Sequence, residues 1–165
     1  EEAFTSGQEA KKLKAGNAVV AHLGTLMDTA KELNNVNGPL VLNKVANYFS
    51  TQTGQPVAGN FDAVKKFVSN ETEAFLVQGG GGEREREALH SDLSNAKNLT
   101  QLSGIAKKYI KLFGGQFNAF ETQYKSGYGK RDFQSTFLTP ETKAALDSVN
   151  QRSTDQTSGA WSVVK

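Results

Sequence analysis

The stretch that decides the fold is NLTQLSGIAKKYIKLFGGQFNAFETQYK, residues Asn98–Lys125. Its apolar and aromatic residues recur every three or four positions, which is the spacing of one face of an α-helix. The residues of this face are Leu102, Ile105, Tyr109, Leu112, Phe113, Phe117, Phe120 and Tyr124. Asn98 and Gln101 stand at the cap and third helical positions of a capping box. The pattern therefore predicts a helix over residues 99–125, roughly 40 Å long at 1.5 Å per residue and the longest element of the chain.

Two adjacent glycines, Gly114 and Gly115, interrupt this stretch near its middle. Glycine lowers helix propensity, so the pair needs a reason. One interpretation is that a neighbouring helix approaches closely at this point. The other is a kink or a break in the long helix. The sequence leaves both open.

The same helical period continues upstream of this stretch. It predicts helices over residues 17–33, 39–52, 60–78 and 83–96, the third of them capped by Asn60. Downstream, Thr139-Pro140-Glu141 is typical of a helix start and predicts a short helix to about Val149. The expected fold class is all-α: a helical bundle of about five helices with one long helix near 99–125 and an irregular C-terminal extension.

The pattern also suggests how the chain is divided. We expect an N-terminal arm over residues 1–16, a helical domain over 17–125, and a region over 126–165 made of a loop, the short helix and a polar tail. The run Gly79–Gly82 lies inside the helical domain and is predicted to act as a hinge. In the tail, the apolar anchors Trp161, Val163 and Val164 are candidates for docking, either on the chain's own domain or on a partner.

Length and composition exclude several classes of protein. The chain has 165 residues, 19 Lys and Arg against 17 Asp and Glu, and 37% hydrophobic residues. This length suits one domain, and the net charge of +2 excludes a generally basic nucleic-acid-binding protein. The absence of cysteine excludes disulfides, thiol nucleophiles and thiolate metal sites. No apolar run approaches the roughly 18–20 residues that a transmembrane helix needs.

Residues that carry chemistry are sparse. The two histidines, His22 and His90, lack the spacing of a metal site. Glu71 lies near an apolar stripe and is expected to be a partly buried acid or, more often for such residues, a partner at a helix crossing. The acids that follow the glycine run would repel a phosphate at that helix start. We therefore expect no enzyme activity, no catalytic residues, no cofactor, no metal and no small-molecule substrate.

Two groups of basic residues are candidates for contact with phosphates or an anionic surface. The first group lies on one side of the long helix and comprises Lys107, Lys108 and Lys111. The second lies beside Tyr124 and Tyr128, which we expect to be exposed, and comprises Lys125, Lys130 and Arg131. Such contacts would weaken steeply with salt. The alternative for both groups is an ordinary solvated polar surface.

Four segments in this order carry a resemblance to a known class of domain: Thr51–Pro56, Asn60–Lys65, Gly79–Glu87 and Phe137–Leu146. Over about residues 17–147 the chain resembles a helical domain of tailed-bacteriophage and prophage proteins. That domain occurs in virion-associated and DNA-ejection proteins, including large ones that also carry a peptidoglycan-cleaving domain. The resemblance implies a structural or ejection role in the particle and supplies no catalytic residues.

The expected function is therefore that of a non-enzymatic structural or DNA-ejection component of a tailed-phage virion. We expect it to form a homo-oligomer, to pack against other virion proteins, and to reside in the phage particle after assembly in the host cytoplasm. One alternative is a nucleic-acid-binding accessory protein that makes non-specific DNA contacts through its lysines. A second alternative is a helper domain attached to a peptidoglycan-cleaving enzyme.

The hinge hypothesis gives a first prediction. Replacing Gly79–Gly82 with four alanines removes the backbone freedom of the segment, because alanine favours the helical conformation that glycine disfavours. Helical content by circular dichroism should stay nearly unchanged, whereas particle assembly or ejection should be impaired. Normal infection by particles that carry the variant would contradict the hypothesis.

Overall fold

The computed structural model describes residue 4 and residues 6–32, 38–78, 81–128 and 132–155. Within these ranges the chain is all-α, with seven helices and no strands. The helices are α2 (Gln8–Glu32), α3 (Gly38–Thr53), α4 (Phe61–Gln78), α5 (Glu83–Asn95), α6 (Leu99–Tyr128), α7 (Phe133–Phe137) and α8 (Pro140–Asp155). The expected all-α bundle with one long helix is confirmed, although the described residues form more helices than the five expected.

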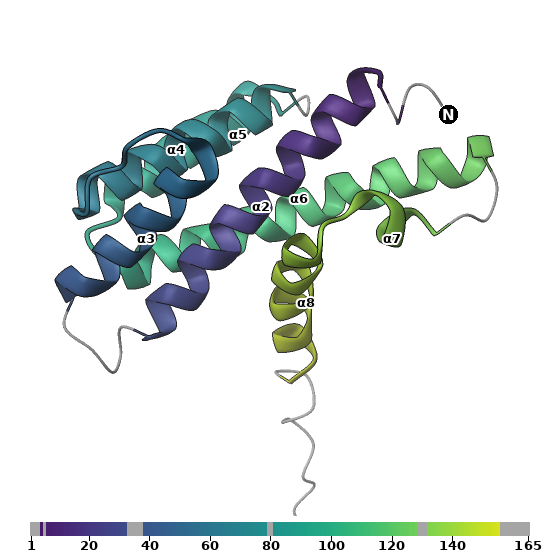
Figure 1. Cartoon of the computed structure of the whole chain (residues 1–165). Coiled ribbons are helices and arrows are strands. Elements are labelled where there is room, and N and C mark those ends of the chain that lie inside the picture. The colour runs from purple at the N-terminus through teal and green to yellow at the C-terminus, as the bar shows by residue number, and fades with distance from the viewer. Residues whose placement is uncertain (1–3, 5, 33–37, 79–80, 129–131, 156–165) are drawn as a thin grey trace, which may run out of the picture.

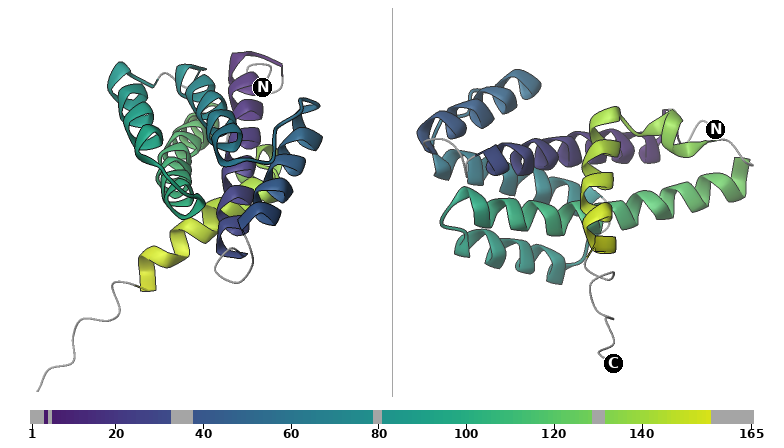
Figure 2. Two further views of the ribbon diagram at one scale, coloured as in Figure 1. Left: turned by 90° about the vertical axis from the view of Figure 1, so that its left-hand side faces the viewer. Right: turned by 90° about the horizontal axis from the view of Figure 1, so that it is seen from below.

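Two long helices, α2 and α6, form the centre of the bundle (Figure 1). Helices α3 and α4 pack on α2, and α5 packs on α4 and α6. Helix α8 crosses both central helices at a steep angle, and its C-terminal end leads away from the bundle (Figure 2). The described chain thus forms one packed body from which the end of α8 projects.

One continuous hydrophobic core holds these helices together. Its largest fully buried side chains include Phe49, Phe75, Phe113 and Phe133. Phe75 of α4 meets Phe113 of α6 edge to face, with ring centroids 4.7 Å apart, and Phe49 of α3 stacks on Phe67 of α4 at 4.4 Å. Such aromatic pairs stabilise beyond the area that they bury. The core is therefore rich in aromatic contacts between helices.

The first long helix begins earlier than the periodicity predicted. Helix α2 starts at Gln8 rather than at residue 17, so most of the expected N-terminal arm is helical. The reason is a second buried seam along α2, which steps by three and four residues through Leu13, Gly16, Val20, Leu23, Met27 and Ala30. Burial of Leu13, only 3% exposed, extends the helix through the lysine-rich segment before residue 17.

The long helix has the predicted start. The Asn98 side chain accepts a hydrogen bond from the Gln101 backbone N–H at 2.9 Å, and the Gln101 side chain accepts one from the Lys97 backbone N–H at 2.7 Å. These bonds satisfy backbone donors that a helix start otherwise leaves unpaired. The helix runs three residues past Lys125 to Tyr128, through a segment expected to be a loop.

The first of the two adjacent glycines, Gly114, is explained by the close approach of another helix and not by a break in α6. Helix α6 is continuous through both. A Cβ added to Gly114 would lie 3.0 Å from Leu146 of α8, whereas one added to Gly115 would meet nothing within 4 Å. On the other side of α8, a Cβ added to Gly24 of α2 would lie 2.8 Å from the Cβ of Ala145. Glycines on both central helices therefore let α8 cross them closely.

The C-terminal region is more helical than the sequence predicted. Helix α7, a single turn, was not expected, and α8 continues to Asp155 instead of ending near Val149. Asp132 caps α7 by accepting a hydrogen bond from the Ser135 backbone N–H, and this bond lowers the pKa of the Asp132 carboxyl. Residues 156–165, which include the proposed docking anchors Trp161, Val163 and Val164, lie outside the described residues.

One buried side chain joins α2 to the junction between α7 and α8. The Asn17 amide donates to the carbonyl of Phe137 at 2.7 Å, and its side-chain oxygen accepts from the Thr139 backbone N–H at 3.0 Å. The Asn17 carbonyl in turn accepts a bond from the Thr142 hydroxyl at 3.1 Å. We call this group the Asn17 clamp. It pairs partly buried polar groups at the start of α8 with a side chain of α2.

Substituting Asn17→Ala should destabilise the fold by about 3 kcal/mol, because it leaves the Phe137 carbonyl and the Thr139 N–H without their partners. Asn47→Ala, at an exposed position of α3, is the matched control and should change stability little. Urea denaturation followed by circular dichroism measures both variants. Equal stability of the two variants would contradict the role of the clamp.

Candidate functional site: the surfaces on either side of helix α6

The first group of predicted contact residues lies on the outer side of α6. Lys108 donates to the Asp92 carboxylate of α5 at 2.6 Å, so its charge is largely compensated within the chain. Lys107 and Lys111 lie one helical turn apart, close to Lys108. These three residues are therefore brought together as predicted, with an acidic side chain of α5 beside them.

The second predicted group is not brought together with the first. Lys125 lies roughly 20 Å further along the helix axis from Lys111. It binds Glu121 at 2.6 Å, and the bonds from Lys125 and then from Gln134 lower the pKa of the Glu121 carboxyl. Lys130 and Arg131 lie outside the described residues.

The prediction that Tyr124 is exposed beside Lys125 is wrong. Tyr124 is 2% exposed and belongs to the core, where its ring contacts Phe4, Phe133 and Phe137. Tyr128 is 39% exposed and contacts the same cluster. Burial by α7 and by Phe4, neither of which the local pattern reveals, explains the difference.

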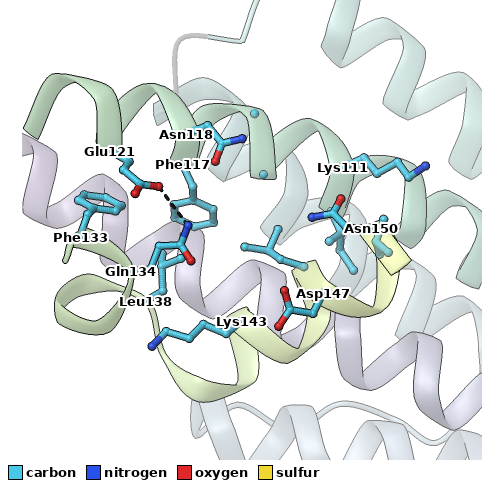
Figure 3. Close-up of a pocket in the computed structure, with 15 residues that line it drawn as sticks. Lys111, Phe117, Asn118, Glu121, Phe133, Gln134, Leu138, Lys143, Asp147 and Asn150 are labelled. Carbon is cyan, nitrogen blue, oxygen red and sulfur yellow. Dashed lines mark hydrogen bonds between the residues drawn. The ribbon is translucent and has the colours of Figure 1, made fainter. Parts of the chain in front are cut away.

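A hollow of about 420 Å³ lies between α6 and the α7–α8 region. Figure 3 shows Glu121 and Gln134, which are hydrogen-bonded at 3.1 Å, at one end of it, and Asp147 and Asn150 of α8 at the other. Carboxylates, amides and the ammonium groups of Lys111 and Lys143 line the hollow, and the described residues add no histidine, cysteine or serine to it. This set of side chains can hold water or small polar molecules.

A second hollow runs along the outer groove between α5 and α6. It consists of two adjoining parts of about 670 and 350 Å³, which share Gly104 and Lys108. Its floor is apolar, with Ala88, the open position of Gly104 and the 39% exposed Leu112. Acidic residues of α5 form one wall and the lysines of α6 form the other. We call this hollow the α5–α6 groove.

Tyr109 lies beneath the α5–α6 groove and is 2% exposed. Burial, followed by the negative charge of Asp92, raises the pKa of Tyr109 from its ordinary value of 10.0 to about 12. Its hydroxyl lies near Asp92 but forms no hydrogen bond of normal geometry within the described part of the chain. The neutral phenol is thus a fixed part of the groove at physiological pH.

A buried histidine and a glutamate meet on the other side of the bundle. Nδ1 of His22 in α2 contacts the carboxylate of Glu71 in α4, and the His22 ring packs against Tyr48, Phe49 and Phe67. The expectation that Glu71 is a partner at a helix crossing is confirmed. His90 and Glu73 form a second pair between α4 and α5, at 3.4 Å. Both pairs join helices to each other.

The proposed hinge lies only partly within the described residues. Gly79 and Gly80 lie outside them. The Gly81 backbone N–H donates to the Leu76 carbonyl at 2.6 Å, and Gly82 stands at the cap position of α5 with extended backbone. Helices α4 and α5 pack on each other on either side of this segment. Flexibility of the segment stays a prediction.

The described residues hold no group of three or more side chains suited to binding a metal ion. None of the described helices combines the length and hydropathy needed to cross a bilayer. No protein-family model, curated protein or solved structure matches the chain.

The raised pKa of Tyr109 predicts a loss of stability at alkaline pH. Between pH 10 and about 12 the unfolded chain ionises this tyrosine while the folded chain keeps it neutral, so a rise in pH favours unfolding. The contribution is fully present below pH 10. In Tyr109→Phe the free energy of unfolding should fall less steeply across this window, as measured by urea denaturation in a series of alkaline buffers. Equal slopes in the two proteins would contradict the assignment.

Proposed function

We propose that this protein is a non-enzymatic structural or DNA-ejection component of a tailed-phage virion, and that it acts by packing its helices against other protein surfaces. Its resemblance over about residues 17–147 to a domain of virion-associated proteins supports the proposal. So does the helical architecture of the described residues, in which ionisable pairs such as His22–Glu71 join helices to each other.

The observation that carries the proposal is the combination of charge and apolar surface on α6. Lys108 and Lys125 are each bound by a carboxylate of the same chain. Next to Lys108, the α5–α6 groove leaves Leu112 accessible on an apolar floor. Compensated lysines attract a polyanion weakly, whereas an apolar groove with charged walls suits a protein partner.

Non-specific DNA binding through the lysines is the second candidate function. Lys107 and Lys111 on one helical surface favour it, since they stand one turn apart and can contact successive phosphates. A filter-binding assay with duplex DNA over a salt series tests it. Binding with a steep salt dependence supports this function, and no binding at low salt excludes it.

A helper role beside a peptidoglycan-cleaving domain is the third candidate, and it follows from the resemblance alone. Zymography of the isolated chain on peptidoglycan shows clearing only if the chain itself carries lytic activity. A peptidoglycan pull-down tests the helper role without requiring that activity.

The proposed function predicts that the protein is part of the purified phage particle. Mass spectrometry of particles that have been freed of soluble protein should detect it at a constant number of copies per particle. Deletion of its gene should leave particles that do not assemble fully or that adsorb without delivering DNA, as measured by potassium efflux and by DNA entry into the host.

The matched control for the deletion is complementation with the intact chain, which should restore infectivity. Absence of the protein from purified particles, together with normal infectivity of the deletion phage, would contradict the proposal.

A further inference from the structure

We propose that the α5–α6 groove is a self-association surface, and that a second copy of the same chain occupies it, related by a two-fold axis that runs along the groove. The inference deepens the proposed function, on which it rests, by naming the partner and the surface. The groove has an apolar floor and walls of opposite charge, and both features suit a second copy of the chain.

The groove has the dimensions and chemistry of a helix-packing surface. From Gln101 to Leu112 it follows α6 for about 16 Å, which is three turns of helix. Gly104 opens it, because a Cβ at this position would meet nothing within 4 Å. Leu112 is among the few large hydrophobic side chains that the described residues leave exposed. A floor of small and apolar residues permits close approach of another helix.

The charges on the two walls select the occupant. Glu85 and Asp92 stand on the α5 wall, and Lys107, Lys108 and Lys111 stand on the α6 wall. A two-fold axis along the groove places the α5 wall of one copy over the α6 wall of the other at the same height. Asp92 and Lys108 are already paired within each chain, so Glu85 of each copy then faces Lys107 of its partner, twice by symmetry.

Other arrangements of two copies are less favourable. A two-fold axis across the groove places α5 over α5 and α6 over α6, so like charges oppose each other. A nucleic acid or an anionic lipid would be attracted by one wall and repelled by the other. The walls are therefore complementary to themselves, which is the property that a symmetric dimer requires.

Sedimentation equilibrium of the full chain, over a concentration series from micromolar to millimolar, tests the proposal. The expected result is a reversible monomer–dimer equilibrium. The variant Gly104→Leu places a large side chain in the groove, where it would occupy the space of the second copy. It should therefore raise the dissociation constant of the dimer by about tenfold or more. Gly127→Leu is the matched control, because Gly127 is an equally open position of α6 that lies roughly 22 Å beyond Leu112 along the helix, and it should leave the constant unchanged.

Two further sets of variants test the floor and the walls. Leu112→Asp should weaken the dimer, whereas Leu40→Asp, at a 66% exposed leucine of α3 outside the groove, should not. Glu85→Lys and Lys107→Glu should each weaken the dimer, and the double variant should recover part of the loss because the pairing is restored with reversed signs. Circular dichroism confirms that each variant is folded.

Several outcomes would overturn the proposal. These are a chain that stays monomeric at every concentration, a trimer or larger assembly, or a dimer that Gly104→Leu and Leu112→Asp leave intact. Binding of duplex DNA or of phosphatidylglycerol vesicles by the monomer, lost in Gly104→Leu, would assign the groove to a different occupant. A chain that is monomeric but is found in particles would contradict the self-association surface and leave the proposed function standing. A chain that is dimeric but is absent from particles would contradict the proposed function and leave the self-association surface standing.

Discussion

The Asn17 clamp is the interaction on which the arrangement of the C-terminal half depends. The buried Asn17 amide accepts and donates the hydrogen bonds that fix the start of α8, and it does so from α2. These bonds are partly buried, so loss of Asn17 removes partners that water replaces only in part. The clamp fixes where α8 begins, and the close approaches at Gly24 and Gly114 fix how it crosses the two central helices. Hydrogen bonds thus fix where α8 starts, and steric contact at the two glycines fixes its direction.

Some of the ionisable residues of the bundle join helices to each other. His22 with Glu71, His90 with Glu73 and Lys108 with Asp92 each connect two helices that also share apolar contacts. Such pairs add specificity of register to packing that the apolar side chains drive. The described surface offers the α5–α6 groove, the polar hollow between α6 and α8, and a hollow of about 940 Å³ that His22 and Glu71 line. Lys111 lines both the α5–α6 groove and the polar hollow.

Much of the fold can be predicted from the local pattern of the sequence. The features that could not be predicted depend on contacts between residues far apart in the chain. The apolar period, the Asn60 cap and the Asn98–Gln101 capping box locate α4 and α6 because the interactions that start these helices lie within a few residues. The start of α2 was placed too late because a glycine, Gly16, occupies one step of its buried seam. Helix α7 has five residues, too few to show a period.

The site was less predictable than the fold for the same reason. The lysines of α6 could be grouped by helical spacing, but their partners could not, since Asp92 comes from a different helix. The burial of Tyr124 depends on Phe4 at the other end of the chain, and the bonds of Asn17 join residues 120 and more positions apart. Contacts of this kind leave no signal in a local window of sequence.

The manner in which α8 leaves the bundle has a consequence for architecture. Val149 of α8 is buried, and the helix continues to Asp155, roughly 9 Å further along its axis. The exit is at the flank of the body, midway along the central pair, rather than at either tip. In a dimer that forms through the α5–α6 groove, each copy would therefore carry one such helix end on its flank.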